Sequence, residues 1–376
     1  SKDPSFFHSS GLEGDLISRH LGYGKELFLR DASSKLTIFA PTKNFFQKPF
    51  SIENVKFVPI KSYFRLGYLF FGTISVLRET SLNGCKTVTC QTPFEDFYLA
   101  FLVSKFFKSR LIVQLHFDLF SKHWLEERLF NGILKRLALK SLCASDIVRV
   151  VSSSQKNAII DNLSSLEEKI RICPVPVSIT NVNITKQTFQ MCVPQTKRVC
   201  IGFIGIFYEP KNLHFWVDVA EQLAINNAEV DFCLWGDGPL TTNIKEYVKK
   251  KSVLEGRFFF KGRFPYQDIQ FAYSAIDIFL LTSFYEGFGR VLVESGLMKL
   301  PAVSSDSGGP SDIILNGVTG FLIEGFKIDS YVEKLERLTK NSALRKKFGE
   351  AAYKRCSSNF SQEKITTDLI DIWLED

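Results

Sequence analysis

The segment Ser283-Phe-Tyr-Glu-Gly-Phe-Gly-Arg-Val-Leu-Val-Glu-Ser295 directly follows the apolar run from Ile276 to Leu281. The apolar run is typical of a buried strand, and the residues after Gly289 have the pattern of a helix. Gly287 and Gly289 lie between the two. Glycines in this place let backbone N–H groups approach a ligand closely, and a helix N-terminus favours anions. The segment therefore predicts a strand–loop–helix unit with an anion-binding loop.

A second loop of the same kind follows a short way on. Ser305-Asp-Ser-Gly-Gly-Pro-Ser-Asp312 comes after the strand predicted at Ala302-Val-Ser304. In open α/β sheets, ligands bind beyond the carboxyl ends of the strands, so the two loops would jointly hold a phosphorylated ligand. Upstream, Gly202-Phe-Ile-Gly205 leads to Lys211, which can neutralise a diphosphate. A glycine pair alone is equally typical of a strand that packs closely against a helix.

Short apolar runs alternate with helical patterns along the whole chain, which predicts parallel sheets covered on both faces. Pro41 and Pro59 are expected to close the first two strands, and a long helix is expected from Trp124 to Leu142. The predicted strands are residues 36–40, 54–58, 86–90, 111–115, 146–151 and 169–173 in the first half, and residues 199–204, 230–235, 258–260, 276–281 and 302–304 in the second.

A polar, proline-containing stretch at residues 174–196 is interpreted as a linker between two domains. We expect one Rossmann-like domain at residues 1–178 and another at residues 196–358. A C-terminal helix at residues 360–376 is expected to pack back on the first domain. The predicted fold class is α/β, with two Rossmann-like domains facing a cleft.

The composition excludes several classes of protein. The chain has 376 residues, of which 45% are hydrophobic and 14% aromatic, and a disordered chain would be poorer in both. No apolar stretch approaches the roughly 20 residues that a membrane-spanning helix needs. None of the eight cysteines forms a Cys-x-x-Cys pair, which argues against a zinc site and a disulfide framework. With no secretory signal found, a reducing cytoplasm is the expected location.

Positive charge is concentrated in the first half of the chain. Residues 1–180 hold 24 Lys and Arg against 16 Asp and Glu, or +8, whereas the remainder holds 23 against 24, or −1. Such asymmetry can attract an anionic partner or membrane surface, and it is also typical of an ordinary solvated surface. The aromatic segment from Tyr63 to Phe71 is likewise open to two interpretations, a buried helix or an interfacial face touching membrane or a lipid-linked acceptor.

Several motifs occur in a fixed order over more than a hundred residues of the second half. They are Gly202-Phe-Ile-Gly-Ile-Phe-Tyr-Glu-Pro-Lys-Asn212, Leu234-Trp-Gly-Asp-Gly-Pro239, Phe260-Lys-Gly-Arg263, the pair Glu286 and Glu294, and Ser305-Asp-Ser-Gly-Gly-Pro310. This region resembles the donor-binding domain of glycosyltransferases with the two-Rossmann architecture known as GT-B. It is most similar to the retaining family four, the glycosyl transferases group 1. The first half resembles that family in its alternation of predicted strands and helices and in the sequence around His116.

The resemblance implies a set of site residues. Glu286 would bind hydroxyls of the donor sugar, Lys211 would bind the diphosphate, and His116 would reach across the cleft toward the transferred sugar. These three are the expected catalytic residues. Donor binding would fall to Glu294 on the nucleotide ribose, to backbone N–H groups of the loop after Glu286, and to glycine loops and a basic residue near the phosphates and base: Gly287, Phe288, Gly289, Arg263, Gly205, Gly11 and Gly14.

The implied reaction is retaining transfer of a sugar from a nucleotide-sugar donor to a saccharide or lipid-linked acceptor. We expect no metal, because no Asp-x-Asp triplet occurs in the chain, and no cofactor, because the nucleotide sugar is a substrate. We also expect no nucleic-acid partner. Peripheral contact with an anionic membrane through the basic first domain is a further expectation. One departure stands out, since Ile206 occupies the place where the family usually has an arginine. The diphosphate would then have one cationic partner fewer.

Two other functions are compatible with parts of the sequence. A non-catalytic protein that binds nucleotide sugars or glycans would share the fold, and Ile206 is the best support for it. A nicotinamide-dependent oxidoreductase would also have Rossmann-like domains. It would need a Gly-x-Gly-x-x-Gly turn after its first strand and an acidic residue about 20 positions further on, and the chain has no such turn.

Overall fold

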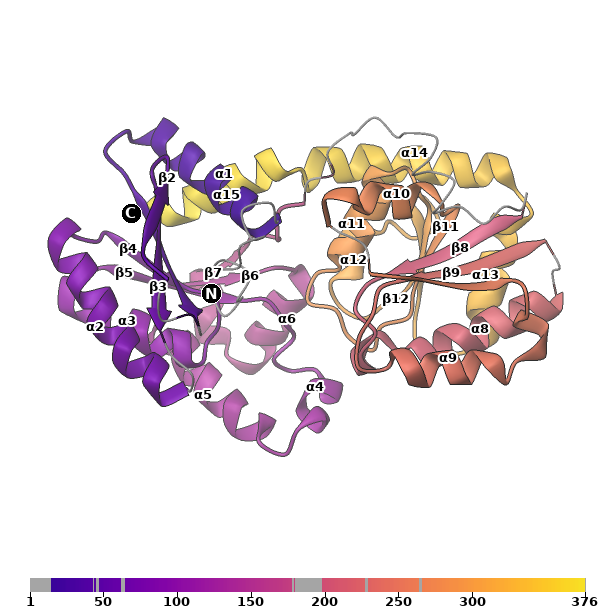
Figure 1. Ribbon diagram of the computed structural model, residues 1–376, viewed down its shortest axis with the longest axis horizontal. Coiled ribbons are helices and arrows are strands. Elements are labelled where there is room, and N and C mark those ends of the chain that lie inside the picture. Colours follow the sequence, from indigo (N-terminus) through magenta and orange to yellow (C-terminus); the bar gives the residue numbers. More distant parts are fainter. Residues whose placement is uncertain are drawn as a thin grey trace. The chain divides into compact units, whose positions relative to one another are not determined.

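The chain divides into two compact units in the computed structural model (Figure 1). Unit 1 consists of Ser1–Pro176 together with Glu363–Asp376, and unit 2 consists of Val177–Gln362. The C-terminal segment thus belongs to unit 1, although unit 2 separates the two in sequence. The structure describes residues 15–42, 44, 47–61, 65–177, 179, 198–226, 229–263 and 266–375.

Unit 1 contains two described sheets. The first has the order β1-β3-β2, in which β1 and β3 run parallel and β2 runs antiparallel to β3. The second is parallel throughout, with the order β4-β5-β6-β7. The strands are β1 (Leu36–Thr42), β2 (Phe50–Ile52), β3 (Val55–Lys61), β4 (Thr87–Cys90), β5 (Arg110–Leu115), β6 (Ile147–Val150) and β7 (Ile170–Ile172).

Neither proline closes its strand as the sequence predicted. Pro41 lies inside β1 and Pro59 inside β3. Proline lacks the N–H that a strand donates to its neighbour, so it is tolerated where a strand has no partner on one side. In the described residues β2 pairs only with Val55–Phe57, so at Pro59 strand β3 has already passed the end of β2.

The parallel sheet of unit 1 is covered on both faces by helices. Leu111, Val113 and Leu115 of β5 face a core that includes α3 (Glu95–Phe107) and α5 (Asn131–Ala144). The intervening Ile112 faces the other core, which contains side chains of α1 (Asp15–Arg30) and α15 (Gln362–Leu374). Successive strand residues point to opposite faces, so a strand buried on both faces is apolar throughout, as the sequence predicted for β5. The other helical segments of the unit are α2 (Arg65–Asn83), α4 (Lys122–Glu127), α6 (Ser153–Asn162) and the 3-10 helix η3 (Ser164–Lys169).

The long helix predicted from Trp124 to Leu142 is wrong, because the chain breaks it into α4 and α5. Arg128 has an extended backbone, with φ of −146° and ψ of 140°. The buried Asn131 side chain donates a hydrogen bond of 2.6 Å to the Trp124 carbonyl, the group that a continuing helix would pair with the N–H of Arg128. Asparagine side chains compete with backbone hydrogen bonds in this way.

Unit 2 has one six-stranded sheet with the order β10-β9-β8-β11-β12-β13, and all its pairs are parallel. In Figure 1, α8 and α9 lie below this sheet, and α10, α11 and α14 lie above it. The strands are β8 (Val199–Ile204), β9 (Val230–Trp235), β10 (Phe258–Gly262), β11 (Ile278–Leu281), β12 (Ala302–Ser305) and β13 (Gly320–Ile323). The helical segments are η4 (Glu209–Lys211), α8 (Leu213–Asn226), α9 (Thr241–Lys249), η5 (Ser252–Leu254), η6 (Tyr266–Asp268), α10 (Ile269–Ser274), α11 (Arg290–Leu297), α12 (Pro310–Ile313), α13 (Ile328–Thr339) and α14 (Ser342–Asn359).

The predicted α/β class with parallel sheets is confirmed. The strand order of unit 2 places β8, β11 and β12 side by side, so their carboxyl ends meet at the same edge of the sheet. The loops that carry the predicted donor site leave from these three ends. Within the part of the chain that the structure describes, no helix combines the length and the apolar character needed to cross a bilayer.

Candidate functional site

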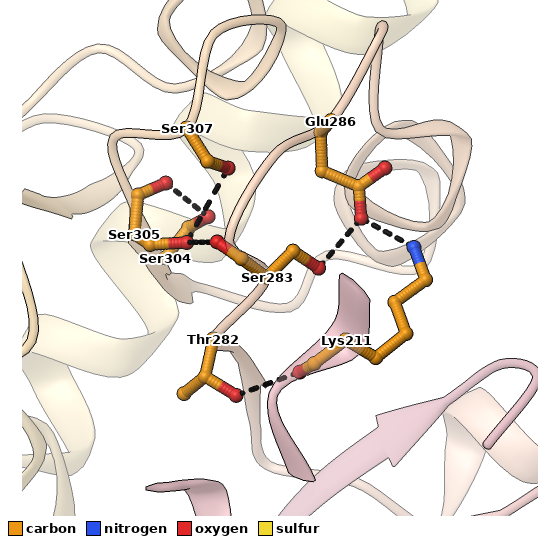
Figure 2. Close-up of polar contacts among 7 residues, drawn as sticks. All are labelled: Lys211, Thr282, Ser283, Glu286, Ser304, Ser305 and Ser307. Atoms are coloured by element: carbon orange, nitrogen blue, oxygen red, sulfur yellow. Dashed lines mark hydrogen bonds and ion pairs between the residues drawn. The ribbon is translucent and has the colours of Figure 1, made fainter. Parts of the chain in front are cut away.

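Lys211 and Glu286 form an ion pair at the carboxyl edge of the unit 2 sheet. Lys211 ends η4, which follows β8, and Glu286 lies in the loop between β11 and α11. Figure 2 shows the Lys211 ammonium and the Glu286 carboxylate pointing toward each other, and Nζ contacts Oε1. Only 13% of the Lys211 side chain and 11% of the Glu286 side chain are exposed. Two residues predicted from separate motifs therefore share one partly enclosed site.

Backbone contacts hold the Lys211 and Glu286 loops together. The Phe284 N–H donates to the Pro210 carbonyl at 2.8 Å. The Thr282 hydroxyl lies 3.2 Å from both the Lys211 and the Asn212 carbonyl oxygens. Thr282 is fully buried, so these contacts are shielded from water. They fix where the Lys211 side chain starts relative to the Glu286 loop.

The loop after β12 pairs directly with Glu286. The Glu286 N–H donates to the Ser307 carbonyl at 2.9 Å, and the Gly309 N–H donates to the Glu286 carbonyl at 3.0 Å. The Ser305 hydroxyl donates to the Ser283 carbonyl at 2.7 Å, and the Ser283 hydroxyl donates to Glu286 Oε1 at 2.7 Å (Figure 2). The two glycine loops predicted to converge are thus bonded to each other.

Two glycines make this convergence sterically feasible. A Cβ atom on Gly309 would lie 2.4 Å from the Phe288 Cα and carbonyl oxygen, so the two loops touch backbone to backbone. Gly289 is the N-cap of α11 and has a φ of +100°, a conformation that side chains with a Cβ rarely adopt. Phe288 is buried and packs edge-on against Phe360, with ring centroids 5.5 Å apart. The Phe288 side chain therefore anchors the loop.

Opposing effects act on the charge of Lys211. Burial lowers its pKa, but the charge of Glu286, that of Tyr208 and the hydrogen bond to Glu286 raise it, and the net pKa lies above the usual lysine value. Lys211 is therefore an ammonium at neutral pH. The site holds one fixed positive charge beside the N-terminus of α11, where the helix dipole adds partial positive charge.

Glu294 lies in the second turn of α11 and has a different set of partners. It is 4% exposed. Its carboxylate accepts hydrogen bonds from the Tyr273 hydroxyl at 2.7 Å and from the Tyr266 hydroxyl at 3.2 Å, and Arg290 lies 3.6 Å away. Burial and the charge of Glu294 raise the Tyr273 pKa well above its usual value, so this tyrosine remains a hydrogen-bond donor. Neither Tyr266 nor Tyr273 was predicted as a site residue, because nothing in the sequence around them indicates a binding role.

The remaining donor-side residues of unit 2 follow neighbouring strands. Gly205 follows β8 and donates its N–H to the Trp235 carbonyl at 3.0 Å. A Cβ on Gly236 would lie 1.8 Å from the Gly205 carbonyl oxygen, so the loops after β8 and β9 are in close contact. Arg263 is exposed after β10. The Thr241 hydroxyl, the Gly238 N–H and the charge of Arg263 lower the pKa of Asp237, so Arg263 is near the loop after β9.

His116 belongs to unit 1, where it directly follows β5. Its Nε2 lies 3.1 Å from Gln91 Oε1. Burial, followed by the charges of Arg149 and Arg19, lowers the pKa of His116 to about 3. His116 is therefore neutral at physiological pH and can act only as a neutral hydrogen-bonding group. The other two unit 1 predictions, Gly11 and Gly14, lie outside the described residues.

Within the described ranges, no group of three or more His, Cys, Asp or Glu side chains is placed to hold a metal ion. The groups that unit 2 offers a ligand are the Lys211 ammonium, the Glu286 carboxylate and the N–H groups that begin α11. A cation and helix N–H groups suit an anion, and a carboxylate suits hydroxyl donors. The arrangement fits a ligand that carries both phosphate and sugar hydroxyls.

Residues 186–355 match the family model described as Glycosyl transferases group 1. The match covers most of unit 2 and less than half of the chain. The matched segment includes Lys211, Glu286 and Glu294, so the ion pair and the tyrosine-bound carboxylate both lie within it.

Two curated relatives are glycosyltransferases. Over 180 residues the chain is 29% identical to a poly(ribitol-phosphate) alpha-N-acetylglucosaminyltransferase of Staphylococcus aureus (strain COL), covering 48% of this chain and 36% of the relative. Over 143 residues it is 30% identical to a UDP-Gal:alpha-D-GlcNAc-diphosphoundecaprenol alpha-1,3-galactosyltransferase of Escherichia coli, covering 38% of this chain and 36% of the relative. The chain thus aligns with about a third of the length of each.

The whole chain resembles a solved structure in fold. Anabaena Alr3699/HepE, crystallised with UDP and glucose, has a TM-score of 0.75 and 17% sequence identity, and the match covers 100% of this chain and 98% of that one. The two-Rossmann GT-B fold class predicted from the sequence is confirmed. That the two domains face a cleft stays a prediction.

Proposed function

We propose that this chain is a retaining glycosyltransferase that moves a sugar from a nucleotide-sugar donor to a saccharide or lipid-linked acceptor without a metal ion. The observation that carries the proposal is the Lys211–Glu286 pair between two bonded glycine loops, at the N-terminus of α11. The family match of residues 186–355 supports the donor class.

In the proposed reaction, negative charge develops on the departing nucleoside diphosphate. Lys211 and the N–H groups of α11 stabilise that charge as the bond from the sugar C1 to the phosphate oxygen breaks. The acceptor hydroxyl forms its bond to C1 on the same face, which retains the configuration. Its proton goes to the phosphate oxygen that leaves. The proposed step therefore requires neither a protein base to take up the proton nor a metal ion.

Glu286 is proposed to accept hydrogen bonds from hydroxyls of the donor sugar. In the described structure one of its oxygens already contacts Lys211 and Ser283. A carboxylate has about four lone-pair sites, so capacity remains for sugar hydroxyls. The ion pair sets the position of the carboxylate, while the diphosphate would share the ammonium.

Glu294 is proposed to bind the ribose hydroxyls, and Arg263 and Gly205 to line the base and phosphate ends of the donor. The tyrosine hydrogen bonds support the role of Glu294 because they fix its carboxylate in one orientation. His116 is proposed to contact the transferred sugar as a neutral hydrogen-bonding group. Gly11 and Gly14 are proposed as a loop over the phosphates.

The acceptor class rests on the relatives. One of them acts on a sugar linked to diphosphoundecaprenol and another on poly(ribitol-phosphate), as their names state. A saccharide or lipid-linked saccharide is therefore our proposal for this chain, and a cytoplasmic location goes with it. The identity of the sugar and of the nucleotide depends on side chains around the donor that differ between such enzymes.

The test is release of nucleoside diphosphate from a panel of nucleotide sugars, with and without saccharide acceptors. Glu286→Gln and Lys211→Met should each lower kcat by about 10²- to 10³-fold, as the loss of one transition-state contact does. Glu294→Gln should mainly raise the KM for the donor. Turnover should persist in EDTA, and the product should keep the anomeric configuration of the donor by NMR.

Glu350→Gln is the matched control, because Glu350 is half exposed in unit 2 and pairs with Lys299. It should leave kcat and KM unchanged. Equal turnover by wild type, Glu286→Gln and Lys211→Met would defeat the assignment of the site.

A non-catalytic donor-binding protein is the second candidate. Ile206 favours it, since 61% of this apolar side chain is exposed where the resemblance implies an arginine. Calorimetry that finds tight donor binding, together with no turnover across sugars and acceptors, would support this function. In that case Ile206→Arg should restore turnover if the missing cation is the reason.

A further inference from the structure

Two helices of unit 1, α2 and α3, expose large apolar side chains to solvent. On each helix these side chains recur at intervals of three to four residues, so they form one stripe along the outer face. The exposed fractions are 64% for Phe70, 46% for Phe71, 52% for Ile74, 44% for Tyr98, 51% for Leu102 and 70% for Phe106.

The two stripes lie beside each other because α2 and α3 pack in parallel. The Tyr68 hydroxyl donates to Asp96 Oδ1 at 2.9 Å, and a Cβ on Gly72 would lie 2.9 Å from a methyl group of Leu99. Both contacts join positions 27 or 28 residues apart, which sets the register of the pair. Figure 1 shows the two helices side by side at the lower left. In this register, Ile74 comes level with Leu102.

Basic residues accompany the apolar stripes. Arg78 on α2 and Lys105 on α3 are exposed, and Lys108 is exposed directly after α3. Of the three acidic side chains on these helices, Asp96 is buried, Glu79 forms an ion pair of 2.5 Å with Lys56, and Glu95 is half-buried. Among the described residues of the two helices, no exposed side chain is acidic.

We propose that this surface, formed by the outer faces of α2 and α3, docks unit 1 onto an anionic lipid bilayer. Aromatic and aliphatic side chains flanked by Lys and Arg are the combination that inserts into the boundary between head groups and acyl chains. An anionic leaflet attracts the cations within a Debye length. Charge decides against a second copy of the chain, because a symmetric contact would bring like charges together without acidic partners.

Both interpretations of the aromatic segment from Tyr63 to Phe71 have an observation behind them. Tyr63 and Phe64 lie outside the described residues; of the rest, Tyr68 is buried at 9% exposure, whereas Phe70 and Phe71 are exposed. The inference rests on α2 and α3 alone. It adds to the proposed function only by favouring an acceptor that is held at the same bilayer.

The test is co-sedimentation of the full chain with vesicles. Vesicles of phosphatidylcholine alone are compared with vesicles that contain about one third phosphatidylglycerol. Wild type should bind the anionic vesicles at least about tenfold more tightly. The double variants Phe70→Ser/Phe71→Ser and Leu102→Ser/Phe106→Ser should each weaken that binding by at least about tenfold. Lys105→Gln/Lys108→Gln should weaken it by about 25-fold, or about fivefold for each charge removed.

Ile225→Ser is the matched control, because Ile225 is 62% exposed on α8 of unit 2. It should bind anionic vesicles as wild type does. The proposal is overturned if wild type stays in the supernatant with both vesicle types, or if the surface variants bind as tightly as wild type. It is also overturned if light scattering finds a dimer that Phe70→Ser/Phe71→Ser dissociates.

Donor turnover in vesicle-free buffer reports on the proposed function separately. If the wild type does not bind vesicles but turns over donor, only the docking proposal is contradicted. If it binds vesicles but does not turn over donor, only the proposed enzymatic function is contradicted. Circular dichroism of each variant checks that the substituted helices remain folded.

Discussion

Glu294 illustrates how neighbouring side chains determine what a carboxylate can do. Tyr273 binds one of its oxygens and Tyr266 the other, while Arg290 stands close by. A buried carboxylate without such partners would be expensive to keep charged. The two tyrosines therefore stabilise the charge and also fix the direction in which free lone pairs point.

Tyr273→Phe removes the shorter of these hydrogen bonds, together with the 3.3 Å contact of the same hydroxyl with the Val291 carbonyl. We expect the KM for the donor to rise about five- to tenfold, because a freed carboxylate oxygen reorients, with kcat nearly unchanged. The free energy of unfolding should fall by about 1 kcal/mol. Tyr68→Phe is the control, since Tyr68 of unit 1 is also buried and donates to a carboxylate, Asp96 Oδ1, at 2.9 Å. It should lower stability without raising KM, and an equal rise in KM would contradict the role given to Tyr273.

His116 gives a pH dependence with a definite sign. Its pKa is about 3 in the folded chain, below the ordinary value of 6.5, so the unfolded chain binds the proton more tightly. The stability due to neutral His116 is fully present above pH 6.5 and is lost as the pH falls toward 3. The slope from this group is at most ~1.4 kcal/mol per pH unit.

Urea unfolding between pH 4 and 7 measures this slope. His116→Gln should flatten it, because glutamine does not titrate. In the pH profile of kcat, no inflection from His116 is expected between pH 5 and 8. A slope that is the same in wild type and His116→Gln would contradict the lowered pKa.

The sequence predicted some site residues and missed others for a physical reason. Lys211 and Glu286 stand in motifs with glycines at loop positions, and those motifs imply a shared sheet edge. Tyr273 sits in an ordinary helical pattern on α10, and its contact with Glu294 spans 21 positions. Such a contact depends on how α10 and α11 pack, which local spacing does not encode.

At the scale of elements, the contact between the loops after β11 and β12 leaves no space for a side chain at Gly309. Gly309→Ala would push a methyl group into the Phe288 backbone at 2.4 Å, and a backbone cannot move away as a flexible side chain can. We expect turnover to fall at least about 10²-fold, since small displacements of a site are costly. Turnover and thermal melting measured on the same sample separate loss of geometry from loss of folding.

Gly132→Ala is the control for this glycine. Gly132 lies at the start of α5, and a Cβ there would meet nothing within 4 Å. Alanine is favoured over glycine in a helix by up to ~1 kcal/mol, so this variant should be as stable as wild type or more stable. Wild-type turnover in Gly309→Ala would show that the two loops need not touch.

The same scale shows where periodicity succeeds and where it fails. The limits of β8 were predicted correctly because a buried strand is a continuous apolar run, here preceded by Arg198 and followed by Gly205. The prediction of a single helix from Trp124 to Leu142 was wrong because the spacing of apolar residues contains no information about the Asn131 side chain, which bonds the Trp124 carbonyl in place of a backbone N–H. Leu129 is 99% exposed at this break, so its position in the apolar pattern was misleading.

At the scale of the whole molecule, α15 ties the end of the chain to unit 1. Leu369 is 1% exposed in a core with Tyr23, Leu27 and Ile112. Leu369→Ala should lower the free energy of unfolding of unit 1 by about 2–5 kcal/mol, as comparable cavities do. Leu374→Ala, at a position that is 40% exposed, should change it by less than ~0.5 kcal/mol.

Urea unfolding followed by circular dichroism measures both variants. Calorimetric titration with nucleoside diphosphate reports on unit 2 separately. The affinity of the Leu369→Ala variant for nucleoside diphosphate should equal that of the wild type. An unchanged unfolding curve for Leu369→Ala would mean that α15 contributes little to the core of unit 1.

The placement of α15 has a consequence for how the protein is made. A ribosome completes every residue of unit 2 before it reaches Leu369 and Trp373, whose side chains help to fill the core of unit 1. During translation, the parallel sheet of unit 1 therefore has one apolar face, which includes Ile112 and Ile147, exposed until α15 is synthesised. Unit 2 can already fold during this time. Nascent chains paused before residue 363 should accordingly be the ones that chaperones and proteases recognise most readily.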